Sequence, residues 1–233
     1  MPDNTEIKDG LGNLFTLRSR DLSASQDGSL WRSMVFHTPL PIDYGGGGAF
    51  HRTTVSGVMG ANAAAKIPIY AFQWGSANYY ALIRRVKMSG LSNSVGFSPG
   101  VAKFDMLTLR DFGEQLVGGS AVPLGSNNAK LRTSHNSSVA SIMHSDTSAL
   151  TGGIYTADTG PGTTESWIIG VGDQPFTPFS TAPMKLFDRP TGEMPLLLAT
   201  TEGFMIQATV PATGTWSFSI TCEWEEIPLN VGY

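Results

Sequence analysis

Cysteine, charged residues and long apolar runs are all scarce in this 233-residue chain. Cys222 is the single cysteine, which excludes an intramolecular disulfide and a zinc site made of several thiolates. Charged residues make up 15% of the chain and the formal net charge is −4, so the basic stripe that a nonspecific nucleic-acid binder needs is missing. No apolar run reaches the ~18 residues of a membrane-spanning helix. We therefore expect neither nucleic acid nor a membrane as a partner.

The sequence also lacks the motifs of metal and nucleotide sites. The four histidines are not spaced two or four residues apart, as metal-binding pairs often are; they are His37, His51, His135 and His144. The run Gly45–Gly48 is followed by Ala49 and Phe50 rather than by the Lys-Ser/Thr of a phosphate loop, so it predicts a turn. We expect no metal and no cofactor.

Signatures of catalysis are equally weak. No Gly-x-Ser-x-Gly elbow is present. Glu223 and Glu225 share one face of a predicted strand at about 7 Å, near the separation that inverting glycosidases use. Glutamates on the wet face of a terminal strand also keep that face in solvent and discourage edge-to-edge pairing, and we favour this interpretation. The sequence therefore predicts no catalytic residue and no enzyme.

What the chain does contain is a strictly alternating C-terminal stretch. Phe204, Ile206, Ala208 and Val210 alternate with more polar residues, and after Pro211–Gly214 the alternation resumes from Trp216 to Trp224. Period-2 patterning with aromatic and β-branched residues is typical of half-buried strands. We expect the two runs to form a β-hairpin against a facing sheet, since a lone hairpin is marginal in water. The predicted core residues are Phe204, Ile206, Trp216, Phe218, Ile220, Cys222 and Trp224.

Further short strands with turns between them are predicted along the chain. They span Leu14–Arg18, Leu30–Thr38, Pro68–Trp74, Tyr79–Met88, Val101–Phe112, Val139–His144, Trp167–Val171 and Met194–Thr200. Ala61–Lys66 is Ala-rich and suits one helical turn, whereas Thr151–Thr164 is expected to be irregular. No fixed-period repeat is present. The pattern predicts an all-β fold, an antiparallel two-sheet β-sandwich of jelly-roll type over residues 14–233, preceded by an extended N-terminal arm over residues 1–13.

The segment Tyr79–Met88 leaves two interpretations open. As a strand, it puts Tyr80, Leu82, Arg84, Val86 and Met88 on one face and the intervening residues on the other. Tyr79, Leu82, Ile83 and Val86 also fit the spacing of an amphipathic helix. Its basic residues, Arg84, Arg85 and Lys87, are expected at a solvated or subunit-facing strand edge.

Several stretches together resemble small virion structural proteins of tailed bacteriophages and prophages. They are Ile7–Asn13, Ile69–Trp74, Ala81–Val86, Lys130–Ser134, Glu202–Phe204, Thr213–Trp216 and Glu223–Trp224. The resemblance covers most of the chain, rests on strand faces and turns, and carries no catalytic motif. It implies a capsid cement or decoration protein, often trimeric, or a head-fibre or tail component.

The function expected from these observations is a non-enzymatic virion structural protein, made in the host bacterial cytoplasm. We expect a homotrimer that bridges neighbouring subunits of the major capsid protein or another virion protein. The expected subunit and capsid contacts are Ile7, Leu11, Leu14, Arg84 and Arg85. The alternative is a receptor- or glycan-binding module of a head fibre or tail, in which Trp74, Tyr79 and Tyr155 stack on sugars.

Overall fold

The computed structural model describes the chain in ten stretches, which fall into two compact units, Met1–Leu40 and Pro41–Tyr233. The stretches are residues 4–8, 14–18, 48–61, 66–92, 101–125, 129–131, 135–157, 168–175, 183–188 and 195–229. The strand predicted at Leu30–Thr38, the interior of the predicted helical turn at Ala61–Lys66, and Leu11 lie outside them.

The first unit contains one antiparallel strand pair. β1 (Asn4–Lys8) runs beside β2 (Leu14–Arg18), with Ile7 opposite Phe15 and Lys8 opposite Leu14. Part of the expected arm is therefore a strand, and its partner is the predicted strand Leu14–Arg18.

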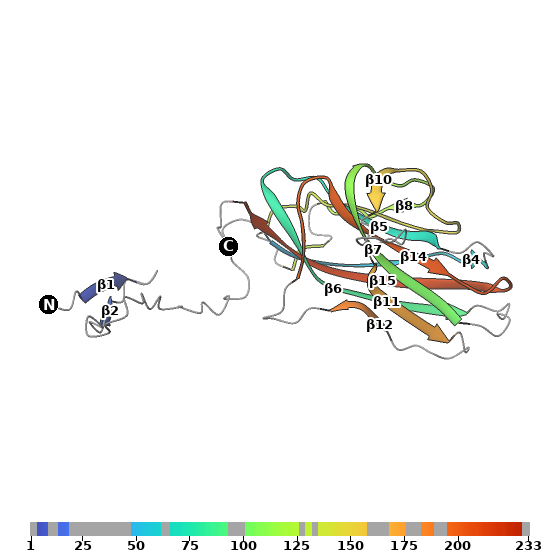
Figure 1. The fold of residues 1–233 in the computed structure, drawn as a ribbon, viewed down its shortest axis with the longest axis horizontal. Helices are drawn as coiled ribbons and strands as arrows, with labels where there is room; N and C mark the ends of the chain where they lie inside the picture. The colour runs from blue at the N-terminus through green and yellow to red at the C-terminus, as the bar shows by residue number, and fades with distance from the viewer. Residues whose placement is uncertain are drawn as a thin grey trace, which may run out of the picture. The chain divides into compact units, whose positions relative to one another are not determined.

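The second unit is a sandwich of two antiparallel sheets, which Figure 1 shows as stacked layers. Among the described residues, one sheet has seven strands: β5 (Ile67–Trp74), β7 (Val101–Glu114), β8 (Ser120–Ala121), β9 (Ser141–His144), β10 (Ile154–Ala157), β11 (Ile168–Pro175) and β14 (Glu202–Thr209). The other has six: β3 (Gly48–Val55), β4 (Met59–Gly60), β6 (Tyr79–Ser92), β12 (Met184–Asp188), β13 (Leu196–Leu198) and β15 (Thr215–Pro228). The all-β, two-sheet prediction is confirmed; the jelly-roll connectivity stays a prediction.

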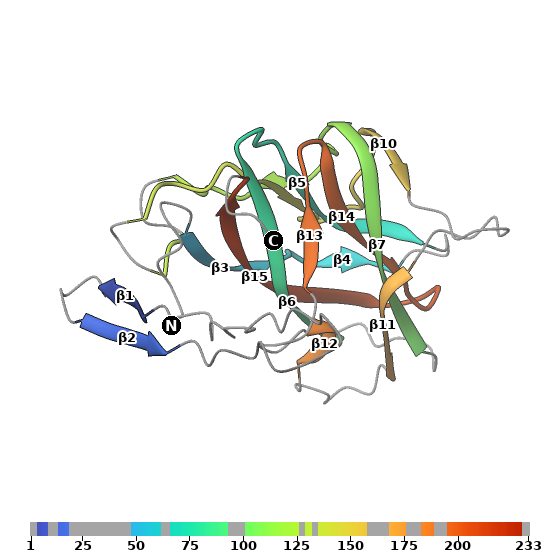
Figure 2. The same cartoon turned by 60° about the vertical axis from the view of Figure 1, so that its left-hand side comes forward.

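β6 and β15 form the centre of the six-stranded sheet. β15 pairs with β6 along its whole length and with β3 and β4 on its other side. β12 and β13 pair with the far side of β6, and Figure 2 shows β13 beside it. β15 is thus an interior strand, so the expectation that its glutamates protect a sheet edge was wrong.

The predicted hairpin of the two C-terminal strands was also wrong. β14 pairs with β5 and β7 in the seven-stranded sheet, whereas β15 lies in the six-stranded sheet, so Pro211–Gly214 crosses between the layers. Both strands bury alternating apolar residues, and in a sandwich these faces meet across the core instead of lying side by side. Phe72 and Trp224 show the contact between layers, with ring centroids 5.5 Å apart in an edge-on arrangement.

A β-bulge explains why Tyr79–Met88 fitted both a strand and a helix. β6 is a strand, but Glu223 lies opposite Arg85 and Trp224 opposite Ile83, which leaves Arg84 as an extra residue. The bulge shifts the alternation by one residue, so Ile83 and Val86 are both buried in the core. The predicted assignment of faces was wrong for this reason.

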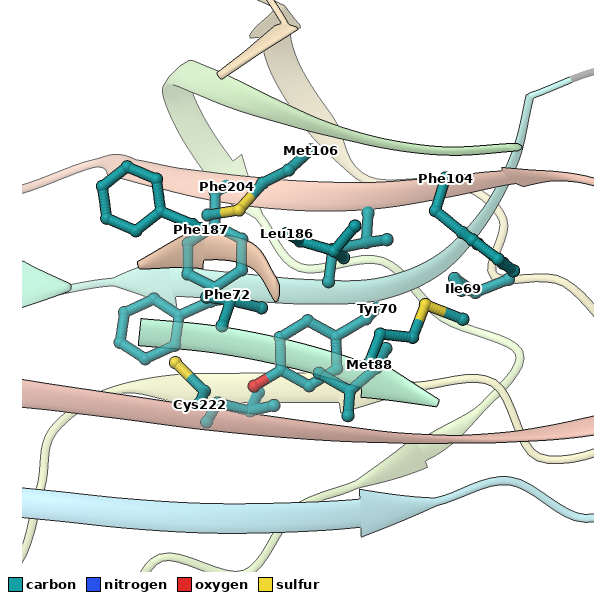
Figure 3. Packing of buried hydrophobic residues seen from close by; sticks show 14 of the residues in the cluster. Ile69, Tyr70, Phe72, Met88, Phe104, Met106, Leu186, Phe187, Phe204 and Cys222 are labelled. Atoms are coloured by element: carbon teal, nitrogen blue, oxygen red, sulfur yellow. The ribbon is translucent and has the colours of Figure 1, made fainter. Parts of the chain in front are cut away.

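The core between the sheets buries every residue predicted for it. Phe204, Ile206, Trp216, Ile220 and Cys222 are fully enclosed, and Phe218 and Trp224 are at most 2% exposed. Figure 3 shows part of this cluster, where the Tyr70 hydroxyl points towards Cys222.

A second, smaller cluster covers the outer face of the seven-stranded sheet. Its members are Ala71, Leu107, Leu109, Phe112, Leu116, Leu150 and Met205. Met205 was expected on the wet face of its strand, but this cover buries it. Several strands were not predicted. Among them, β3 begins at Gly48 of the glycine run, β10 lies in the stretch expected to be irregular, and β12 follows Pro183 directly.

Candidate interaction surface

The outer face of the six-stranded sheet carries a group of ionisable side chains, which we call the charged face. It comprises His51 on β3, Arg84 and Arg85 on β6, Lys185 and Asp188 on β12, and Glu223 and Glu225 on β15. The bulge in β6 places two consecutive arginines, Arg84 and Arg85, on this face. Its extra residue lets both of them reach carboxylates there.

Arg84 binds Glu225 through two parallel hydrogen bonds. Its Nε donates to Oε1 at 3.2 Å and its Nη2 donates to Oε2 at 3.0 Å. Both side chains are about a third exposed or less, at 26% and 31%. This fork-to-carboxylate geometry fixes both side chains in one plane across the two central strands.

Arg85 stands at the centre of a chain of ion pairs. Its Nε donates to Asp188 Oδ1 at 2.9 Å and its Nη1 to Glu223 Oε2 at 3.4 Å. Lys185 Nζ lies 2.7 Å from Asp188 Oδ2, and His51 Nδ1 lies 3.7 Å from Glu223 Oε1. Four strands are therefore joined across the face of the sheet.

The ionisation of this chain follows from its pairing. Hydrogen bonds from Lys185 and Arg85 lower the pKa of Asp188 from 3.8 to about 2. The hydrogen bond to Asp188, followed by the charge of Glu223, raises the pKa of Arg85. Both groups stay charged at neutral pH and hold each other in place.

Uncharged hydroxyl groups continue the same outer face beyond the charged residues. Thr53 Oγ1 and Thr221 Oγ1 lie 2.8 Å apart, and Ser89 Oγ and Ser219 Oγ lie 2.7 Å apart. These short side chains are tied to one another across strands. The outer face therefore carries both paired charges and paired hydroxyls.

The structure corrects the expected setting of Arg84 and Arg85. They were expected at a strand edge, but β6 is interior and both guanidinium groups bind carboxylates of neighbouring strands. Glu225 and Glu223, which have the spacing of a glycosidase pair, are the ion-pair partners of Arg84 and Arg85. Asp188, Lys185 and His51 were not foreseen, because the strands that carry them were missed.

The other expected contact residues are in the first unit or beyond the described stretches. Ile7 lies in β1 and Leu14 in β2, on strands that pair with each other. Leu11 lies outside the described residues. Their role as contacts stays a prediction.

The aromatic residues of the glycan-binding alternative are mostly engaged in packing. Trp74 is fully buried and its Nε1 donates to the carbonyl oxygen of Tyr79 at 2.8 Å. Tyr155 is half-buried and its ring packs edge-on against Phe112, with centroids 5.8 Å apart. Trp74 is therefore out of reach of a sugar.

Cys222 is enclosed by the core. Burial raises the pKa of its thiol, because the charged thiolate loses its hydration there. Among the residues that the structure describes, no three His, Cys, Asp or Glu side chains gather in a way that would hold a metal ion. The described part of the chain also has no helix long and apolar enough to cross a membrane.

A scan against protein-family models and a search of curated proteins find no match to this chain.

Proposed function

We propose that this protein is a non-enzymatic virion structural protein, a capsid cement or decoration protein that bridges capsid subunits as a homotrimer. The charged face is the observation that carries the proposal. The six ionised side chains of the charged face are already paired with one another, so each keeps a counter-ion when a second protein covers it. A surface of this kind gains binding from shape and from many modest contacts, which symmetry multiplies on a capsid.

The sandwich framework supports the same function. Three of the seven stretches that carry the resemblance to phage virion proteins lie in its central strands, with Ile69–Trp74 in β5, Ala81–Val86 in β6 and Glu223–Trp224 in β15. A core with three fully or almost fully buried tryptophans gives the rigidity that a clamp between capsid subunits needs.

The test is binding of purified protein to purified capsids, with the oligomeric state measured by size-exclusion chromatography and light scattering. We expect a trimer that sediments with capsids. Thr53→Arg places a bulky side chain at an exposed position beside the charged face and should weaken capsid binding at least about tenfold. Ala121→Arg is the matched control, because Ala121 is exposed on β8 of the other sheet.

Each outcome of this experiment has a separate meaning. If both variants bind like the wild type, the charged face is not the contact, although a capsid role survives. A monomeric wild-type protein that stays in the supernatant would overturn the proposed function.

A further inference from the structure

Lys87 of β6 lies on the outer face of the six-stranded sheet, next to the charged face. Val86 and Met88 on either side of it are buried in the core, so the alternation of the strand directs Lys87 outwards. It is half-buried, and it lies opposite Thr221 of β15 on one side and Lys185 of β12 on the other. Lys87 is therefore a cation in the interior of this face, with a strand on each side.

The carboxylates of the charged face are already bound to other cations. Asp188 pairs with Arg85 and Lys185, and Glu223 pairs with Arg85. Among the residues that the structure describes, Lys87 belongs to no ion pair and no side-chain hydrogen bond. With Lys87 included, and His51 neutral, the face has one positive charge in excess. Its cations are Arg84, Arg85, Lys87 and Lys185, and its carboxylates are Asp188, Glu223 and Glu225.

A lysine at this position lowers the stability of the protein on its own. Lys87 lies directly opposite Lys185, and like charges in such a cross-strand pair repel each other. The hydroxyl of Thr221 is tied to Thr53, and the hydroxyl of Ser89 to Ser219. Within the described part of the chain, no contact of the Lys87 side chain offsets the repulsion. A local rule that is broken without a gain inside the chain is typical of a functional position.

We propose that Lys87 binds an aspartate or glutamate carboxylate of the capsid subunit that the charged face covers. This inference rests on the proposed function. When a second protein covers the face, the six paired side chains keep their counter-ions, but the ammonium group of Lys87 loses water and gains nothing in return. A carboxylate at the matching point of the partner surface supplies the missing counter-ion. A surface without one leaves a buried, unpaired charge, so Lys87 selects for an acidic residue on its partner.

The affinity of the full chain for nuclease-treated capsids tests this pairing. Lys87→Met keeps the unbranched stem but removes the charge, and it should weaken binding at least about tenfold, because the partner carboxylate then lacks its counter-ion. Lys87→Arg keeps the charge and should lose less affinity than Lys87→Met. Lys66→Met is the matched control: it removes the same charge at an exposed position directly before β5 of the other sheet, and it should bind like the wild type.

Thermal denaturation separates a role in binding from a role in folding. The Tm of Lys87→Met should equal or exceed that of the wild type, because its repulsion with Lys185 is gone, while its affinity for capsids falls. A variant that loses Tm and affinity together would give Lys87 a structural role and would overturn the inference.

Carbodiimide cross-linking identifies the counter-ion, because this reagent joins an amine to a carboxylate that it contacts. Mass spectrometry of the bound complex should find Lys87 linked to an aspartate or glutamate of the capsid subunit. If Lys87 forms no such link, if Lys87→Met binds like the wild type, or if nuclease treatment abolishes binding, the inference fails while a capsid role survives. Wild-type protein that binds neither treated nor untreated capsids would overturn the proposed function itself.

Discussion

Replacing Gly203 by Ala adds one methyl group and so tests how closely the strands of the seven-stranded sheet pack at this position. Gly203 lies on β14, opposite Gln73 of β5 and Leu109 of β7. A Cβ there would overlap the carbonyl oxygen of Phe72 and lie 2.7 Å from Phe112 Cδ1. Neither neighbour moves freely, since one is backbone and the other is a ring of the second apolar cluster.

The size of the effect follows from what must move. Separating β14 from β5 at this point weakens one or two ladder hydrogen bonds, at about 1 kcal/mol each. Displacing Phe112 from its cluster loses about 2 kcal/mol of apolar burial. We expect Gly203→Ala to lower the free energy of unfolding by about 3 to 4 kcal/mol, and Tm by roughly 10 °C.

The free energy of unfolding is measured by urea denaturation for the wild type, Gly203→Ala and a control variant, Gly75→Ala. The control separates the steric effect from the general effect of replacing a glycine. Gly75 has no heavy atom within 4 Å of the place where its Cβ would stand, so Gly75→Ala should stay within about 0.5 kcal/mol of the wild type. If Gly203→Ala is equally silent, β14 does not lie between β5 and β7 beneath Phe112.

Three further predictions concern single side chains. Cys222 should resist thiol reagents in the native protein and react only after unfolding, because it is fully buried; rapid labelling of native protein would contradict this. Asp188→Asn should remove stability at neutral pH but little at pH 2, because the pKa of Asp188, lowered to about 2 by Lys185 and Arg85, makes its contribution disappear as the pH falls from 3.8 through 2; equal losses at both pH values would refute the pairing. Thr201 has φ 62°, a left-handed conformation that Asn tolerates better, so Thr201→Asn should stabilise the fold by about 0.5 to 1 kcal/mol in urea denaturation, and a destabilised variant would count against that backbone.

The terminal strand shows how far the sequence predicts this fold. The alternation from Trp216 to Trp224 identified both the strand and its buried face, because one side of β15 meets the core throughout. The same alternation says nothing about which sheet a strand joins. β14 and β15 satisfy identical patterns in a hairpin or in opposite layers, and only the pairing with β5, β6 and β7 decides between them.

In other strands, local irregularities made the alternation of apolar residues a wrong guide to the buried face. The bulge at Arg84 reverses the alternation within β6, so a period-2 count assigns half of its residues to the wrong face. A second register shift, between Lys185 and Phe187, interrupts β12 in the same way. Met205 was misplaced for a different reason, since the cluster that covers it comes from residues distant in the sequence.

The candidate surface was only partly accessible to sequence reasoning. The pairing of Arg84 with Glu225 joins residues 141 positions apart, and Arg85 reaches Asp188 over 103 positions. Both contacts depend on strand order, which composition and periodicity do not encode. Glu223 and Glu225 lie on the outer face of β15, whereas Glu226 lies on the same side as Trp224. The two-residue spacing from Trp224 was the one sequence signal for the burial of Glu226.

A cryo-EM map of purified capsids incubated with this protein tests the central claim of the proposed function most directly. The proposed function predicts threefold density on the capsid surface into which three copies of the sandwich fit, with the charged face against a neighbouring protein. Capsids without this added density, or a map in which the charged face looks into solvent on an isolated monomer, would contradict it.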